Sequence, residues 1–140
     1  MPFLRLTLDR EPPAEDRRRL AESLTELTAA VLGKNYSLTA LAIDVVPSIR
    51  WTIAAETLAE SRMANAHLDV KVTAGTNTAA EKADFIERAH AALGAVLGPL
   101  APASYIVIDE LPAESWGYGG RTQAARRAAL TAPRAAAITG

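Results

Sequence analysis

The sequence predicts an α+β fold in which a βαβ unit occurs twice in tandem. Two observations support this fold. The order strand, helix, strand appears twice along the chain, and a shift of 65 residues superimposes matching segments of the two halves. Because βαβ crossovers are right-handed, four strands in one sheet would carry both helices on the same face. The matching segments are Val31–Gly33 with Val96–Gly98, Ile43–Asp44 with Ile108–Asp109, Pro47 with Pro112, and Trp51 with Trp116.

The first unit begins with residues 2–9, where apolar and polar residues alternate as in a half-buried strand. Residues 15–32 have apolar side chains at helical spacing, which predicts an amphipathic helix that ends at Gly33. The nearly continuous apolar run 39–46 predicts a strand covered on both faces and ended by Pro47. The buried stripe of the helix is expected to contain Leu20, Leu24, Leu27 and Val31.

The second unit repeats this order. Residues 67–72 alternate as a strand, with Leu68, Val70 and Val72 expected on the buried face. Residues 79–97 predict a helix, preceded by Thr78 as its cap and by a capping box with Glu81. Residues 105–111 predict the last strand of the sheet. The buried stripe of this helix is expected to contain Phe85, Ile86, Ala89, Leu93 and Val96.

These boundaries predict one domain over residues 1–120. It consists of a unit at 2–60 and a unit at 66–120, with residues 55–65 as the link between them. Residues 121–140 form an alanine- and arginine-rich tail, which is expected to dock on a neighbouring subunit or to fray.

The sheet face turned away from the helices is expected to be polar, because Arg5, Thr7, Asp69 and Lys71 alternate with the buried residues. If the first and third strands pair antiparallel, Arg5 and Asp69 can form an ion pair across them. Such a polar face is suited to contact with other subunits around a solvent-filled centre, which predicts an oligomer.

Composition limits the possible function. The formal charge of −1 provides no field that would favour nucleic acid or an anionic membrane. No cysteine is present, so thiolate catalysis and thiolate metal sites are excluded. Neither a signal peptide nor a membrane span is visible, and the expected location is the cytoplasm. The two histidines lack a neighbouring acidic cluster, which predicts no metal site.

Pro2 is the first candidate for chemistry. Initiator methionine is normally removed before proline, which would leave Pro2 with a free secondary amine at the start of a buried strand. Burial lowers the pKa of an amine toward neutrality, where it can act as a general base. The alternative is that the Met-Pro start has no function.

The turn Trp116-Gly117-Tyr118-Gly119-Gly120 carries a family resemblance. It resembles the aromatic-Gly-aliphatic-Gly-Gly turn of the tautomerase superfamily, whose members have an amino-terminal proline and βαβ units around a threefold axis. Residues 2–120 resemble its two-unit members, such as macrophage migration inhibitory factor, and the single unit of 4-oxalocrotonate tautomerase. The resemblance implies a homotrimer that moves a proton in a small 2-keto or enol acid, without a cofactor and with Pro2 as the base.

The same resemblance implies further site residues. Lys34 is expected to bind the substrate carboxylate, and Tyr105 to donate a hydrogen bond to the enolate. Arg10 is a candidate substrate contact. One of Trp51 and Trp116 is expected to wall the Pro2 pocket, from the same subunit or from a neighbouring one. Each of these residues also has a structural interpretation. Lys34 would be a cation at a helix end, and Tyr105 an aromatic residue of a strand. Arg10 would be a solvated loop charge, and the tryptophans would be packing residues. The 65-residue shift places His67 at the position equivalent to Pro2, either beside a second pocket or on the surface.

Departures from the family pattern leave alternatives open. Ala42 and Val107 stand where 4-oxalocrotonate tautomerase has a substrate-binding arginine, and residues 74–77 lack the arginines of family dehalogenases. This argues against dehalogenation and against a strongly anionic substrate. Two other functions remain: hydration, decarboxylation or another family reaction with Pro2 as an acid, or a trimer that binds a partner without catalysis.

Overall fold

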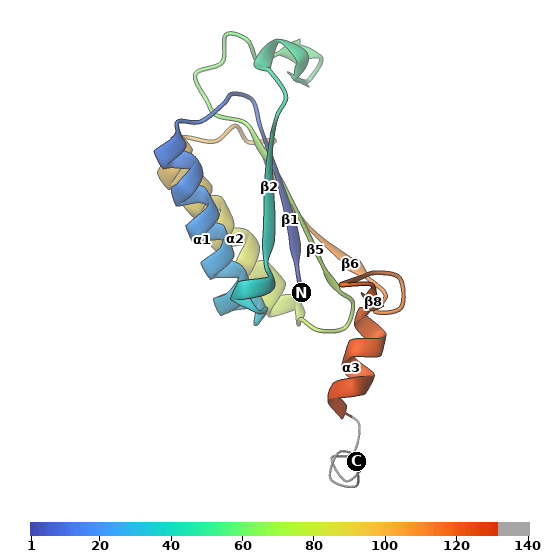
Figure 1. Cartoon of the computed structure of the whole chain (residues 1–140). Coiled ribbons are helices and arrows are strands. Elements are labelled where there is room, and N and C mark those ends of the chain that lie inside the picture. Colours follow the sequence, from blue (N-terminus) through green and yellow to red (C-terminus); the bar gives the residue numbers. More distant parts are fainter. Residues whose placement is uncertain (132–140) are drawn as a thin grey trace, which may run out of the picture.

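The computed structural model describes residues 1–131 and contains one four-stranded sheet (Figure 1). Its strands are β1 (Phe3–Leu8), β2 (Ala40–Val45), β5 (Ala66–Thr73) and β6 (Tyr105–Leu111). The spatial order is β2-β1-β5-β6, with parallel pairing inside each unit and antiparallel pairing of β1 with β5. The predicted tandem of βαβ units is therefore confirmed.

Helices α1 (Ala14–Leu32) and α2 (Ala79–Leu97) lie side by side on one face of the sheet (Figure 1). Between these helices and the sheet lies the core, in which a fully buried leucine contributes about 1.5–3 kcal/mol. Ile86 departs from the predicted stripe because it is 40% exposed. The buried core consists of Leu4, Leu6, Leu8, Leu20, Leu24, Leu32, Ala66, Leu68, Val70, Val72, Phe85, Ala89 and Leu93.

The predicted helix ends have the expected local structure. Gly33 ends α1 in the left-handed region, at φ 67°, where a residue without Cβ is least strained. At the start of α2, the Glu81 backbone N–H donates to Thr78 Oγ1 at 3.1 Å, and the Thr78 N–H donates to Glu81 Oε1 at 2.8 Å. The capping box is therefore complete, and it satisfies two donors that the helix itself leaves unpaired.

The strand register changes one expectation about the repeat. Ile43 pairs with Leu6, and its repeat counterpart Ile108 pairs with Val70, so the two units differ by 64 residues along β1 and β5. Pro2 therefore corresponds to Ala66, and the assignment of His67 to that position is wrong. His67 corresponds to Phe3 and faces away from the helices.

The edge strands are less covered than the sequence suggests. β2 was expected to be buried on both faces, yet all its residues are half-buried or exposed in this single chain. The Arg5 and Asp69 Cα atoms are paired across β1 and β5 as predicted. However, the Arg5 guanidinium forms its ion pair with Asp44 on β2, at 3.3 Å, while Asp69 contacts His67 at 3.2 Å.

Two short hairpins occupy opposite ends of the sheet, one after each unit. β3 (Thr52–Ile53) pairs with β4 (Glu56–Thr57), so part of the predicted link is a strand. β7 (Gly117–Tyr118) pairs with β8 (Arg121–Thr122). The start of the predicted tail is ordered as β8 and helix α3 (Gln123–Thr131), and its residues 132–140 lie outside the described residues. Two 3-10 turns, Tyr36–Leu38 and Ser48–Arg50, flank β2.

Among residues 1–131, no helix is long and apolar enough to cross a membrane.

Candidate active site

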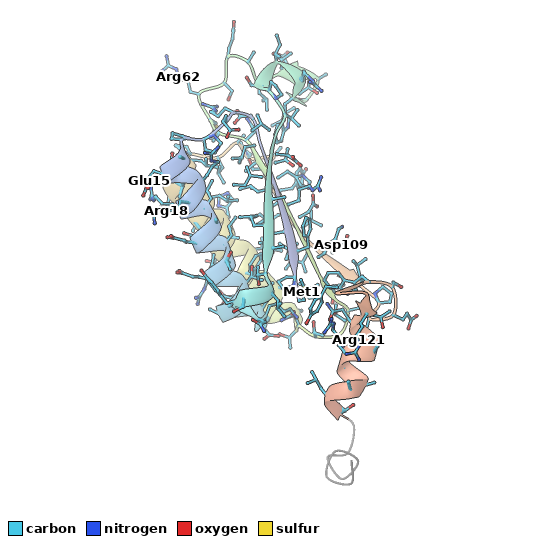
Figure 2. The ribbon with its side chains drawn as sticks, in the orientation of Figure 1. Met1, Glu15, Arg18, Arg62, Asp109 and Arg121 are labelled. Carbon is cyan, nitrogen blue, oxygen red and sulfur yellow. The ribbon has the colours of Figure 1, made fainter. Side chains whose placement is uncertain are left out.

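Met1 lies at the end of the sheet beside the second hairpin and α3 (Figures 1 and 2), where it lines a cavity of about 230 Å³. Pro2 is buried behind it, and the Pro2 carbonyl accepts a hydrogen bond from the Ala40 backbone N–H at 3.3 Å. The sheet therefore fixes the backbone at Pro2. The remaining lining residues of this amino-terminal cavity are Thr73, Tyr118, Gln123, Arg126, Arg127 and Leu130.

Lys34 and Trp116 lie at the same end of the sheet as Pro2. Lys34 Nζ donates to Thr76 Oγ1 at 2.7 Å, and Thr76 Oγ1 donates to the Thr73 carbonyl at 2.6 Å. Trp116 Nε1 donates to Thr73 Oγ1 at 3.2 Å. Because Thr73 also lines the cavity, it links both predicted residues to the amino-terminal site.

The pKa values of two amino groups at this end, the Met1 amine and the Lys34 side chain, are both lowered. Burial first, and the nearby Lys34 second, lower the pKa of the Met1 amine from its usual value. Burial also lowers the pKa of Lys34, and the like charge of Arg127 lowers it further, while Glu81 and Glu110 act in the opposite direction. The surroundings of the chain terminus therefore make an amine there less basic than it would be in water.

The last helix, α3, contributes side chains to this cavity that were not predicted from the sequence. Arg126 places its guanidinium 3.7 Å from the centroid of the Tyr118 ring and donates to the Tyr118 carbonyl at 2.9 Å. These contacts hold α3 against the second hairpin, with Gln123, Arg126 and Arg127 in the cavity wall. The only signal in the sequence was the Arg126-Arg127 pair soon after the glycine-rich turn, in a segment interpreted as a tail.

Tyr105 and Trp51 lie at the opposite end of the sheet within one subunit. Tyr105 pairs with His67, which pairs with Thr7 near the end of β1, and the Tyr105 side chain is 63% exposed. The Tyr105 and His67 rings are tilted, with centroids 6.3 Å apart. Trp51 lines a separate cavity of about 370 Å³ together with Thr7, Val46, Arg50, Thr52 and His67.

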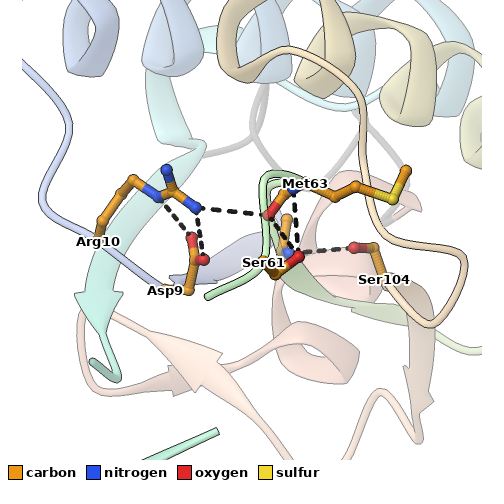
Figure 3. A network of polar contacts seen from close by, with 6 residues as sticks. Asp9, Arg10, Ser61, Met63 and Ser104 are labelled. Atoms are coloured by element: carbon orange, nitrogen blue, oxygen red, sulfur yellow. Dashed lines mark hydrogen bonds and ion pairs between the residues drawn. The ribbon is translucent and has the colours of Figure 1, made fainter. Parts of the chain in front are cut away.

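Arg10 also lies at that opposite end, in a polar network that joins the loop after β1 to the segment around Met63 (Figure 3). Its guanidinium donates to both carboxylate oxygens of Asp9, at 3.1 and 2.9 Å, and to the Met63 carbonyl at 3.4 Å. Asp9 is 3% exposed. Burial alone would raise the pKa of Asp9, but the hydrogen bonds and charge of Arg10 outweigh it, so the pKa is lowered. These contacts indicate a structural role for Arg10.

We expect Asp9→Asn to lower the free energy of unfolding by about 1–3 kcal/mol, because a buried charged acceptor of two hydrogen bonds is lost. The folded pKa of Asp9 is below its usual value, so this stabilisation is present above the unfolded pKa of about 4 and is lost as pH falls through the folded pKa. Urea unfolding of the parent protein and of Asp9→Asn, at pH 7 and below pH 4, measures the difference in the free energy of unfolding at each pH. In the control, Asp109→Asn removes a half-exposed ion pair with Lys71 and should cost at most about 1 kcal/mol.

Within residues 1–131, no three histidine or acidic side chains gather closely enough to hold a metal ion.

Comparison with known proteins gives the family. A family model described as "Tautomerase enzyme" matches residues 67–126. "Probable tautomerase K2" of Dickeya dadantii (strain 3937) is 33% identical over 63 residues, which cover 44% of this chain and 94% of that protein. Both matches indicate tautomerase ancestry.

Solved structures extend the likeness to both units. A "fused 4-OT wild type symmetric trimer" has a TM-score of 0.78 at 19% identity, covering 89% of this chain and 98% of that chain. A macrophage migration inhibitory factor-like protein from Entamoeba histolytica has a TM-score of 0.68 at 21% identity, covering 86% and 97%. At these identities the structures establish the fold, which is that of the two-unit proteins. The fold and the sequence matches point to the same family, and the chain belongs to the tautomerase family.

Proposed function

We propose that the protein is a cofactor-independent tautomerase that moves a proton in a small 2-keto or enol acid, with the amino-terminal nitrogen of Pro2 as general base. The supporting observation is that Met1, next to Pro2, lines a cavity and that burial and Lys34 lower the pKa of its amine. A neutral amine near pH 7 can accept a proton from a weak carbon or enol acid.

The proposed reaction is a balanced proton transfer. In ketonisation, the Pro2 nitrogen takes the proton of the enol hydroxyl, the carbonyl forms, and the same proton is delivered to the adjacent carbon. Lys34 holds the substrate carboxylate. The hydrogen bond from Lys34 Nζ to Thr76 Oγ1, at 2.7 Å, restricts the position of the ammonium group. Trp116, held by Thr73, forms part of the wall.

This mechanism requires removal of Met1. In the chain described, the Pro2 nitrogen is part of a peptide bond, and Met1 occupies space at the cavity wall. Loss of Met1 would convert this nitrogen into a secondary amine and enlarge the cavity beside it.

The test is an intact-mass measurement combined with ketonisation of phenylenolpyruvate, followed by ultraviolet absorbance. The expected result is a chain lacking Met1 that accelerates ketonisation above the buffer rate. A chain that retains Met1 and lacks activity would contradict the proposal and would favour a binding protein without catalysis. If a chain without Met1 ketonises no enol acid, a family reaction in which Pro2 acts as an acid becomes the better proposal.

We further propose that the protein is a homotrimer. The fused 4-OT structures that share its fold are described as trimers, and both edge strands here retain half-exposed residues. Trp51 and Tyr105 lie at the opposite end of the sheet from Pro2 within one subunit, so they can serve its site only from a neighbouring copy. Light scattering should give about three times the chain mass of 14.8 kDa. A stable monomer would contradict this assembly.

A further inference from the structure

We propose that the protein has a second ligand site, at the end of the sheet opposite Pro2, which binds a small aromatic carboxylate without turning it over. The site is the cavity of about 370 Å³ beside the first hairpin, called the hairpin cavity from here on. The proposal does not rest on the proposed function, because it requires neither the Pro2 amine nor a proton transfer. The cavity is lined by Thr7, Val46, Arg50, Trp51, Thr52 and His67.

The hairpin cavity lies on the sheet face turned away from the helices. Thr7 of β1 and His67 of β5 are paired across the two strands, and each alternates with fully buried core residues of its strand. Val46, directly after β2, and residues 50–52, at the start of the first hairpin, complete the lining. Small-molecule sites in proteins occupy about 300–1,000 Å³, so the volume of this cavity suits a small ligand.

Arg50 supplies the charge of this cavity. Its side chain is exposed, and among residues 1–131 it forms no ion pair with a carboxylate. Of the described residues, none that lines the cavity is acidic, and His67 contacts Asp69 at 3.2 Å. A guanidinium without a carboxylate partner can donate two parallel hydrogen bonds to a carboxylate of a ligand. The cavity therefore favours a ligand with a single negative charge.

Trp51 and Val46 give the cavity an apolar wall, and both residues are half-buried. An aromatic ring can pack on an indole in an offset arrangement, and this packing removes the apolar surfaces of both rings from water. Together with the charge of Arg50, this wall favours an aromatic carboxylate over a carboxylate without a ring or a ring without a charge.

The first hairpin keeps a strained turn at this site. Ala54 and Ala55, the two residues between β3 and β4, have φ values of 54° and 67°. This left-handed region is unfavourable for a residue with a Cβ. The shift of 65 residues pairs them with Gly119 and Gly120, which have φ values of 61° and 76° in the second hairpin without that strain. Strained backbone is often found at functional sites, and here it shapes the hairpin that carries Trp51.

The internal repeat explains why this site would bind a ligand without turnover. Trp51 and Trp116 are counterparts at opposite ends of the sheet, and the chain terminus lies at the Trp116 end. Pro2 corresponds in strand register to Ala66, whose nitrogen is an amide that donates to Ser104 Oγ at 3.2 Å. At the Trp51 end, the position of the proposed base is thus occupied by an amide, which cannot act as a base.

The indole N–H signals of the two tryptophans in a proton–nitrogen NMR spectrum report on the two ends of the sheet separately. Trp51→Phe identifies the Trp51 signal. The probes are phenylacetate, phenylacetamide, which has the same ring without the charge, and acetate, which has the charge without the ring. We expect phenylacetate to shift the Trp51 signal and to bind about tenfold or more tightly than either other probe, as a charge-assisted hydrogen bond implies.

Arg50→Gln should weaken this phenylacetate binding about fivefold or more, toward the affinity for phenylacetamide, and should leave ketonisation unchanged. Arg50→Lys, which keeps the charge, should retain part of the affinity. Arg62→Gln is the matched control, because Arg62 is exposed, lies at the end of the sheet away from Met1 (Figure 2) and is outside the cavity lining. It should leave phenylacetate binding unchanged.

The proposal is overturned if phenylacetate shifts only the Trp116 signal or neither signal, or if Arg50→Gln and Arg62→Gln have equal effects. It is also overturned if Arg50→Gln lowers ketonisation together with binding, since the cavity would then belong to the Pro2 site of a neighbouring copy. Binding at Trp51 without ketonisation would contradict the tautomerase proposal alone. Ketonisation without binding at Trp51 would contradict the hairpin-cavity proposal alone.

Discussion

Replacing Pro2 with alanine is expected to lower the kcat for ketonisation by about 100-fold, within the range of 10²–10⁴ that general acid–base catalysis contributes. Activity should not vanish, because alanine also permits removal of Met1 and leaves a primary amine at the same place. That amine is less basic than a secondary amine and lacks the ring that fixes its direction. KM should change less than kcat, since the proton transfer is specific to the transition state.

The pH dependence provides an independent test of the same base. The folded environment lowers the pKa of the Met1 amine, through burial first and Lys34 second. We expect the same causes to lower the pKa of the Pro2 amine that replaces it after removal of Met1. The Pro2 base is therefore expected to become neutral at lower pH than a free amine. The kcat/KM should rise with a slope of one and level off at a lower pH than it would for a free amine. Stopped assays between pH 5 and 9 measure this profile.

Pro13→Ala is the matched control for the Pro2 variant. Pro13 is exposed and precedes α1, far along the chain from the terminus, and its replacement should leave kcat unchanged. If Pro2→Ala ketonises enol acids as fast as the parent protein, then Pro2 is not the base. Equal losses in both variants would indicate a general effect on folding.

The fold was predictable because each element has a strong local pattern. Leu68, Val70 and Val72 alternate on β5 as the period of a strand requires, and all three are fully buried. Thr78 and Glu81 define the start of α2 through local hydrogen bonds that need no tertiary information. The surroundings of the edge strands were less predictable. An apolar run such as that in β2 does not specify whether the residues that pack on its second face come from the same chain or from another.

The site was only partly predictable, for a topological reason. Lys34 follows α1 and lies at the same end of the sheet as Pro2, and its role there stays a prediction. Tyr105 begins β6, which runs parallel to β5, and β5 runs antiparallel to β1, so within one subunit Tyr105 lies at the far end from Pro2. Family resemblance does not state which subunit supplies a residue. The cations of α3 were missed because alanine and arginine without a long apolar stripe gave no reason to expect a packed helix.

Replacing Lys34 with alanine is expected to raise KM about tenfold or more, because a charge-assisted hydrogen bond to the substrate carboxylate contributes about 1.5 kcal/mol or more. kcat should fall much less, since the carboxylate carries the same charge in the ground state and in the transition state. The neighbouring amine should become more basic when the positive charge of Lys34 is removed, so the rise of kcat/KM should move to higher pH.

Lys34→Arg is the conservative comparison, since it keeps a positive charge at the end of α1 while altering the contact with Thr76. It should recover most of the lost affinity and return the pH profile toward that of the parent protein. Steady-state kinetics at several pH values separate the two effects. If Lys34→Ala changes neither KM nor the pH profile, Lys34 is not part of the site. If KM rises without a shift in the profile, Lys34 binds the carboxylate but does not affect the pKa of the base.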